Sequence, residues 1–221
     1  MSGQHKLSFS HVGVFVHDLP KMVDFYTRVI GLVVSDRAVR GDGSEICFMT
    51  LDPREHHQVV FATGRPADLT YNMIQQLSFR AESLAALREK YAALKCEQIV
   101  ELGPLSHGNA ISAYFRDPEG NRLEVFVDTK WHVPQPCAAP LDLTKSEDEI
   151  TAFVEKQVAA LEGVSQRADW ERERTAQFEG QAPADCQAFF ALPRLTPAIC
   201  SITAQTAAVS SSSWPLLRAL L

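Results

Sequence analysis

The feature that most constrains the fold of this chain is a repeat of 65 residues. The segment His11–Leu19 aligns without a gap on Gln76–Leu84 (76 − 11 = 65). The turn dipeptide Asp52-Pro53 falls on Asp117-Pro118 with the same offset (117 − 52 = 65). Such a period predicts two copies of one supersecondary unit that share a hydrophobic core.

Each copy is predicted to contain a strand, a helix and then three strands. In the first copy, Val12 to Val16 alternate with other residue types, which is typical of a strand with two different faces. Asp18 suits the N-cap of the following helix, and Gly31 its end. The other strands of the first copy are predicted over 32–40, 45–51 and 58–63. The second copy is predicted to have a strand over 75–81, a helix over 83–94 and strands over 97–102, 110–116 and 122–128.

A βαβββ unit covers only one face of its sheet with a helix, so two units are expected to curve together around a cavity. The predicted fold class is α+β, with two βαβββ repeats, about 7–64 and 72–129, forming a curved, partly open mixed β-sheet barrel within a domain over 7–136. A helical extension is predicted over 137–180, where Ser146 and Glu149 form a capping box. The Ala/Ser/Thr/Pro-rich segment 181–221 is predicted to be an atypical, poorly ordered tail.

Composition excludes several functional classes. Asp and Glu number 27 against 21 Lys and Arg, and no basic block is present, so we expect no nucleic-acid partner. The apolar runs are too short for a membrane span, and the polar N-terminus lacks a signal sequence, which predicts a cytoplasmic protein. The five cysteines form no CxxC pair, which argues against disulfides or a zinc cluster.

Two segments, HVGVFVHDLPKMVDFYTRVIGL at the start of the first copy and YFRDPEGNRLEVF near the end of the second, resemble the vicinal oxygen chelate superfamily. This superfamily includes glyoxalase I, extradiol ring-cleaving dioxygenases, fosfomycin-resistance proteins and bleomycin-binding proteins. The segment 131–136 resembles the sequence after the last strand in single-domain dioxygenase-like members. The resemblance covers about residues 7–136 and implies a small-molecule substrate and a homodimer.

The resemblance also implies where a metal would bind, because ligands in this superfamily come from the first and last strand of each unit. The corresponding positions are His11, Gln76, Val59 and Glu124. Valine cannot ligate, and extradiol dioxygenases use only three positions, which implies His11, Gln76 and Glu124 as ligands of Fe(II), with Mn, Zn or Ni as alternatives. Gln76 departs from the family pattern, which has a second histidine there, so the alternative is that no metal is bound.

The resemblance further implies His107 and Tyr114 as catalytic groups, because they precede Glu124 in the order seen in ring-cleaving dioxygenases. The residues expected to contact substrate are Phe15, His57, Phe61, Arg80, Arg122 and Phe126.

The predicted function is therefore that of a metal-dependent, extradiol-dioxygenase-like enzyme acting on a small catechol-like or oxygen-chelating substrate. One alternative is a glyoxalase-type lyase or isomerase, against which Val59 argues. The other is a metal-free protein that binds a small ligand, as bleomycin-resistance proteins do, and Gln76 favours this alternative.

Overall fold

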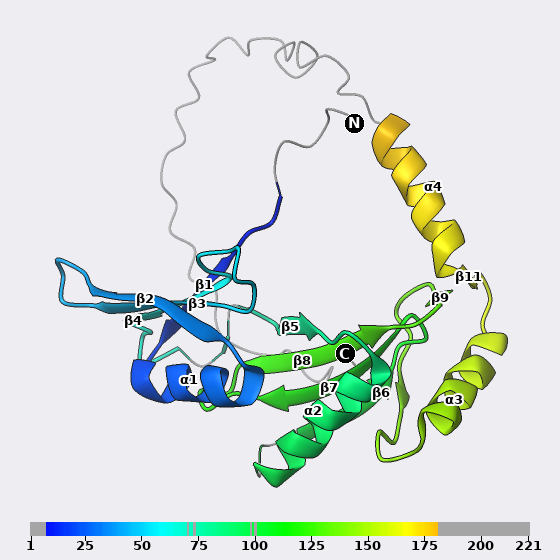
Figure 1. Cartoon of the computed structure of the whole chain (residues 1–221), viewed down its shortest axis with the longest axis horizontal. Coiled ribbons are helices and arrows are strands. Elements are labelled where there is room, and N and C mark those ends of the chain that lie inside the picture. Colours follow the sequence, from blue (N-terminus) through cyan, green and yellow to red (C-terminus); the bar gives the residue numbers. More distant parts are fainter. Residues whose placement is uncertain (1–7, 70, 73, 98, 100, 181–221) are drawn as a thin grey trace, which may run out of the picture. The chain divides into compact units, whose positions relative to one another are not determined.

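A computed structural model describes residues 8–180 except 70, 73, 98 and 100. The first repeat unit contains β1 (Val12–Val16), α1 (Leu19–Phe25), the π-helical turn η1 (Tyr26–Ile30), β2 (Val33–Val39), β3 (Glu45–Thr50) and β4 (Val59–Thr63). Its sheet has the strand order β1-β4-β3-β2, in which β1 and β4 are parallel and the other pairs antiparallel. The helix α1 packs on one face of this sheet (Figure 1).

The second unit repeats this arrangement with β5 (Leu77–Arg80), α2 (Leu84–Cys96), β6 (Glu101–Ser106), β7 (Ala110–Arg116) and β8 (Arg122–Asp128). Its sheet has the order β10-β6-β7-β8-β5, where β10 (Ala139–Pro140) is a two-residue edge strand. The two sheets are mixed and remain separate over the described residues. The predicted α+β class with two βαβββ repeats is confirmed.

The second strand of the second unit differs from its prediction. It was expected over 97–102, and β6 instead covers Glu101–Ser106. Gly103 adopts a positive φ of 103°, at a break in the register between β6 and β7. Pro104 is tolerated because β10 pairs only with the two following residues, which leaves the proline nitrogen without a strand partner on that side. Turn-forming residues inside a bulged strand therefore misled the prediction.

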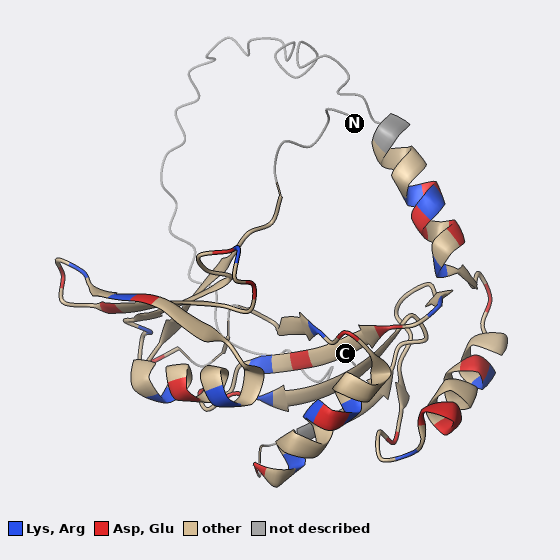
Figure 2. Cartoon of the chain, viewed as in Figure 1, with Lys and Arg blue, Asp and Glu red and all other residues tan. Residues whose placement is uncertain are grey.

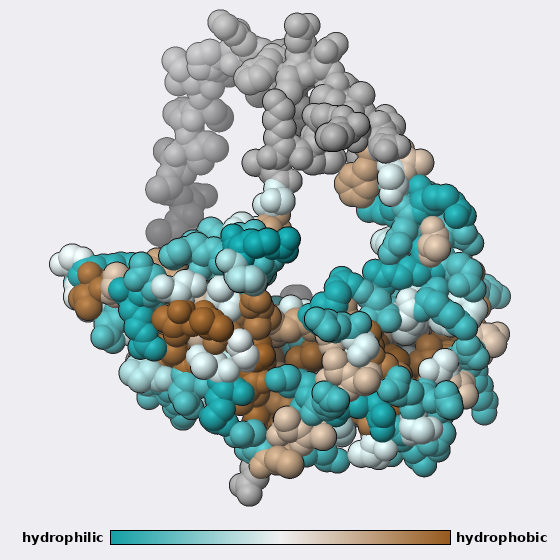
Figure 3. Space-filling view, viewed as in Figure 1, coloured by the Kyte–Doolittle hydropathy of each residue, from teal (hydrophilic) through white to brown (hydrophobic). Residues whose placement is uncertain are grey.

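Helix ends and apolar faces follow the sequence signals. The Asp18 side chain accepts a hydrogen bond from the Lys21 backbone N–H at 2.9 Å, and Gly31 ends the π-helical turn with φ 98°. The apolar sides of α1 and α2 meet the covered faces of their sheets in one hydrophobic core, which includes Met22, Phe61 and Leu123. In Figure 3 hydrophobic residues gather in the region of α1 and the sheet above it, framed by hydrophilic ones.

The extension contains β9 (Trp131–His132), α3 (Glu147–Ala159), β11 (Ser165–Gln166) and α4 (Arg167–Gly180). The predicted capping box of α3 is confirmed, with Ser146 and Glu149 each bonding the other's backbone. Acidic and basic residues are interspersed along all four α-helices (Figure 2). The segment 181–221, for which a poorly ordered tail was expected, lies outside the described residues.

Candidate active site

Glu124 lies in the middle of β8, on the sheet face that α2 does not cover. Its direct cross-strand neighbours are Tyr114 on β7 and Ser78 on β5, and directly opposite residues share a face. The Glu124 side chain is buried, and its carboxylate accepts hydrogen bonds from Ser78 Oγ at 2.6 Å, Gln76 Nε2 at 2.9 Å and Tyr114 OH at 2.7 Å. A buried carboxyl group without such partners would be costly, and these three donors offset the loss of water around Glu124.

The Tyr114 hydroxyl also connects Glu124 to His107. Its oxygen lies 2.9 Å from His107 Nε2, while His107 Nδ1 lies 2.7 Å from the carbonyl oxygen of Cys137. A carbonyl only accepts, so Nδ1 carries a proton. The phenol has one proton, which it cannot donate to Glu124 and His107 at once. One hydroxyl thus lies within hydrogen-bond distance of both a carboxylate and an imidazole.

The hydroxyl of Tyr114 keeps its proton at physiological pH. Burial raises the pKa of Tyr114 to about 12, and the hydrogen bond and negative charge of Glu124 act in the same direction. The phenol therefore remains protonated across the physiological range. It can pass a proton on only by receiving another.

Two of the arginines on the same face as Glu124 stack on aromatic rings. The Arg122 guanidinium lies 4.2 Å from the centre of the Tyr114 ring, and that of Arg80 lies 4.9 Å from the centre of the Phe126 ring. Arg80 also forms an ion pair with Asp128. Three of the predicted substrate-contacting residues, namely Arg80, Arg122 and Phe126, thus surround Glu124 on β5 and β8.

His11 and His57 meet at the other repeat unit. Their ring centres are 4.3 Å apart, and the His57 ring also contacts Phe48 and lies against His56, with 2.8 Å between the two Nδ1 atoms. Burial lowers the pKa of His57, and the neighbouring His11 and His56 lower it further. His57 therefore favours the neutral form, in which an imidazole nitrogen can accept a proton or bind a metal.

A groove of about 700 Å³ connects the two units near these residues. On one side it is lined by Ser10 and Val12, which flank His11 in the chain, and on the other by Gln76 and Ser78, both of which donate to Glu124. Phe15 is 59% exposed and borders a different cavity of about 310 Å³. Within the described part of the chain, no three His, Cys, Asp or Glu side chains are grouped to hold a metal.

The predicted equivalence of Val59 with Glu124 is wrong by one residue. Gly13 pairs with Val60 in the first sheet, whereas Ser78, its repeat partner (78 − 13 = 65), pairs with Glu124 in the second. Eight positions separate Asp52 from Val60 (60 − 52), but seven separate Asp117 from Glu124 (124 − 117), so the first turn holds one extra residue. Val60 is therefore the residue equivalent to Glu124, and it cannot ligate either.

This register shift also places Phe61 in the core rather than at a substrate cavity. Its side chain has no exposed surface, and its ring centre lies 4.6 Å from that of Tyr26. A shift of one residue moves a strand side chain to the opposite face of the sheet. The substrate contact predicted for Phe61 is thus wrong, and its ring instead packs in the core under α1.

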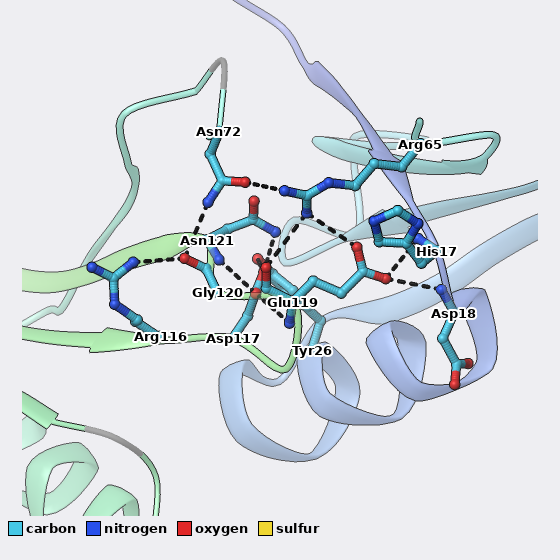
Figure 4. Close-up of polar contacts among 10 residues, drawn as sticks. All are labelled: His17, Asp18, Tyr26, Arg65, Asn72, Arg116, Asp117, Glu119, Gly120 and Asn121. Carbon is cyan, nitrogen blue, oxygen red and sulfur yellow. Dashed lines mark hydrogen bonds and ion pairs between the residues drawn. The ribbon is translucent and has the colours of Figure 1, made fainter. Parts of the chain in front are cut away.

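A buried polar cluster that the sequence did not reveal joins the two units (Figure 4). Glu119, in the turn between β7 and β8, accepts hydrogen bonds from the backbone N–H groups of His17 and Asp18 at 2.7 and 2.9 Å, and forms an ion pair with Arg65 at 3.2 Å. The Tyr26 hydroxyl donates to Asp117 in the same turn at 3.0 Å. The only sequence signal was the Asp-Pro-Glu-Gly-Asn turn at residues 117–121.

Comparison with known proteins assigns the family. The model of the glyoxalase/bleomycin resistance protein/dioxygenase superfamily matches residues 8–125, which is more than half of the 221-residue chain. The chain belongs to this superfamily. It is 30% identical over 125 residues to biphenyl-2,3-diol 1,2-dioxygenase 2 of Rhodococcus globerulus, covering 54% of this chain and 62% of that protein.

Other superfamily members are similar at lower identity. A lactoylglutathione lyase of Arabidopsis thaliana is 24% identical over 152 residues, covering 67% of this chain and 53% of that protein. A crystal structure of a domain of the superfamily from Frankia sp. EAN1pec has a TM-score of 0.50 and 24% identity, covering 57% of this chain and all of that one, and it supports the fold alone. The chain thus spans only part of the curated relatives that it matches. None of the described helices is both long and apolar enough to cross a membrane.

Proposed function

We propose that this superfamily member is a metal-dependent enzyme of the extradiol-dioxygenase type that acts on a small aromatic compound with two adjacent hydroxyl groups. The observation that carries the proposal is the hydrogen-bonded series Glu124–Tyr114–His107, in which Glu124 and Tyr114 lie on the face of the second sheet opposite α2. In this series the Glu124 carboxylate lies beside groups that can hold and move a proton. The groove of about 700 Å³ is within the usual size of small-molecule sites.

A divalent cation would be held by His11, Gln76 and Glu124. This set has one imidazole and two oxygen donors, which suits Fe(II) or Mn(II) better than a thiolate-seeking metal. The Gln76 amide already lies against the Glu124 carboxylate, and it would present its oxygen in place of its N–H group. A bound cation would act as a Lewis acid that lowers the pKa of a substrate hydroxyl.

The protein groups would then handle the released proton. Tyr114 can accept the substrate's proton on its oxygen while passing its own proton to His107 Nε2, which lies 2.9 Å from that oxygen. The Cys137 carbonyl fixes the ring orientation of His107 by accepting from Nδ1. These groups would be positioning and proton-transfer residues for a diol bound next to Glu124.

Metal content and ring cleavage, measured together, test this proposal. Protein purified without oxygen should bind one Fe(II) and convert catechol into a coloured ring-opened product. His11→Ala should lose the metal, whereas His17→Ala, which changes an exposed ring outside the groove, should keep it. Gln76→His should bind Fe(II) at least ten times more tightly. A wild-type protein that takes up no metal, or a His11→Ala variant that retains it, would contradict the proposal.

A second candidate is a metal-free protein that binds a small aromatic ligand. The favouring observation is that both carboxylate oxygens of Glu124 are already bonded to protein donors, so no cation is needed to stabilise its charge. Calorimetry with catechol in the presence of a chelator separates the two functions. Metal-independent binding without turnover supports the second candidate, and binding that requires added Fe(II) supports the first.

A further inference from the structure

Arg122 is a cation with no anionic partner among the described residues. Its Nε atom is buried and makes no hydrogen bond with the described residues, and its guanidinium stacks on the Tyr114 ring. Arg80, on the same face, is instead paired with Asp128. Burying a hydrogen-bond donor without a partner costs free energy, so Arg122 is an unsatisfied cation on this face, where the Ser112 hydroxyl is also buried without a partner among the described residues.

The residue opposite Arg122 on the neighbouring strand is also positively charged. The register of β7 and β8 places Arg116 directly across from Arg122, and like charges directly opposite each other repel. Arg116 is exposed and donates from Nη1 to the Gly120 carbonyl at 2.7 Å, so it is already engaged. Arg122 retains free donors, and an anion bound beside it would offset its repulsion by Arg116.

The spacing relates Arg122 to the proposed active site. Arg122 and Glu124 are two residues apart on β8 and share a face, which separates them by about 6.6 Å along the strand. That distance is comparable to the width of a substituted benzene ring. A ring with its diol at Glu124 can therefore place a substituent on the opposite side against Arg122.

We propose that Arg122 binds a carboxylate group of the substrate, so that the substrate class is aromatic diols that carry a carboxylate across the ring from the hydroxyl groups. This inference rests on the proposed function for the diol, but the anion site itself does not require it. A guanidinium offers two parallel N–H donors to a carboxylate, which a neutral substituent cannot match. The stacking on Tyr114 holds the guanidinium plane and would align the ring with the proton-transfer groups.

The test uses two probes without hydroxyl groups, so that it is independent of ring cleavage. Calorimetry on the full chain should show benzoate binding at least ten times more tightly than benzamide, which has the same shape without the charge. Arg122→Gln should remove this preference, Arg122→Lys should keep part of it, and the matched control Arg116→Gln should change it less than threefold. Protocatechuate, which is catechol with a carboxylate across the ring, should likewise be preferred to catechol.

The outcomes separate the two proposals. Equal binding of benzoate and benzamide by the wild type, or equal losses in the two glutamine variants, would overturn the anion site. If Arg122→Gln does not fold, the wild-type preference and the Arg122→Lys variant still decide. Benzoate preference without any metal uptake or diol cleavage would retain the anion site and overturn the proposed dioxygenase.

Discussion

Tyr114 and Glu124 face each other directly across β7 and β8, with the phenol oxygen 2.7 Å from carboxylate Oε1. Both side chains are buried. The same phenol oxygen contacts His107, so one hydroxyl connects an acidic and a basic group on the side of the second sheet opposite α2. This arrangement makes Tyr114 a structural support of Glu124 as well as a candidate proton-transfer group.

Tyr114→Phe should destabilise the protein, because it removes one of the donors to a buried carboxylate. We expect a loss of about 1–3 kcal/mol in the free energy of unfolding, measured by urea denaturation. The matched control is Tyr71→Phe, since Tyr71 is 65% exposed, and its effect should stay within about 0.5 kcal/mol. Equal stability of Tyr114→Phe and wild type would show that Glu124 does not depend on this hydrogen bond.

The raised pKa of Tyr114 predicts a loss of stability in alkali. An unfolded tyrosine loses its proton near pH 10, whereas folded Tyr114 keeps it to about pH 12. In this interval the unfolded state binds fewer protons, so the free energy of unfolding falls as pH rises. The raised pKa of Tyr114 thus contributes at most ~3 kcal/mol to the free energy of unfolding, and this contribution is fully present below about pH 10.

The readout for this pH effect is the difference between wild type and Tyr114→Phe. Tyr26 has a pKa raised in the same direction by burial and by Asp117, and it is present in both proteins. The stability advantage of wild type should therefore shrink between pH 10 and 12 through Tyr114 alone. A constant difference across that interval would refute the assignment.

Phe61→Ala should behave as a core mutation. The ring is fully buried against Tyr26, so truncation leaves a cavity and is expected to cost about 3–5 kcal/mol. Phe15→Ala provides the comparison, because Phe15 is 59% exposed and should change stability by about 0.5 kcal/mol or less. Thermal unfolding of both variants distinguishes the core assignment from the substrate contact suggested by sequence.

Glu119→Ala should uncouple the two repeat units. The Arg65 and Glu119 side chains are only 9% and 7% exposed, and removing one partner of a buried ion pair costs about 3–5 kcal/mol. Glu147→Ala is the control, because Glu147 is 49% exposed and its contact with Arg88 is 4.0 Å, for which about 1 kcal/mol or less is expected. Similar urea midpoints for the two variants would argue against a buried link.

The repeat and the local sequence signals determine much of this fold without information on tertiary contacts. Strand alternation, the Asp18 cap and the Ser146 capping box are local signals, because backbone propensity and capping act within a few residues. Glu124 stood out for a similar reason, since a carboxylate within an apolar strand needs partners wherever the strand is placed. Its strand and its turn were therefore predictable, whereas its grouping with Tyr114 and His107 was suggested only by the resemblance to ring-cleaving dioxygenases.

Only the tertiary structure decided which face each residue occupies and what it contacts. One extra residue in the turn before β4 moved Phe61 into the core and put Val60 at the position equivalent to Glu124. The link between Arg65 and Glu119 joins residues 54 positions apart in the chain. That Arg122 Nε has no hydrogen-bond partner among the described residues is visible only when its neighbours in space are known. Strand register depends on turn length and side-chain partners depend on packing, and neither is encoded in a local pattern.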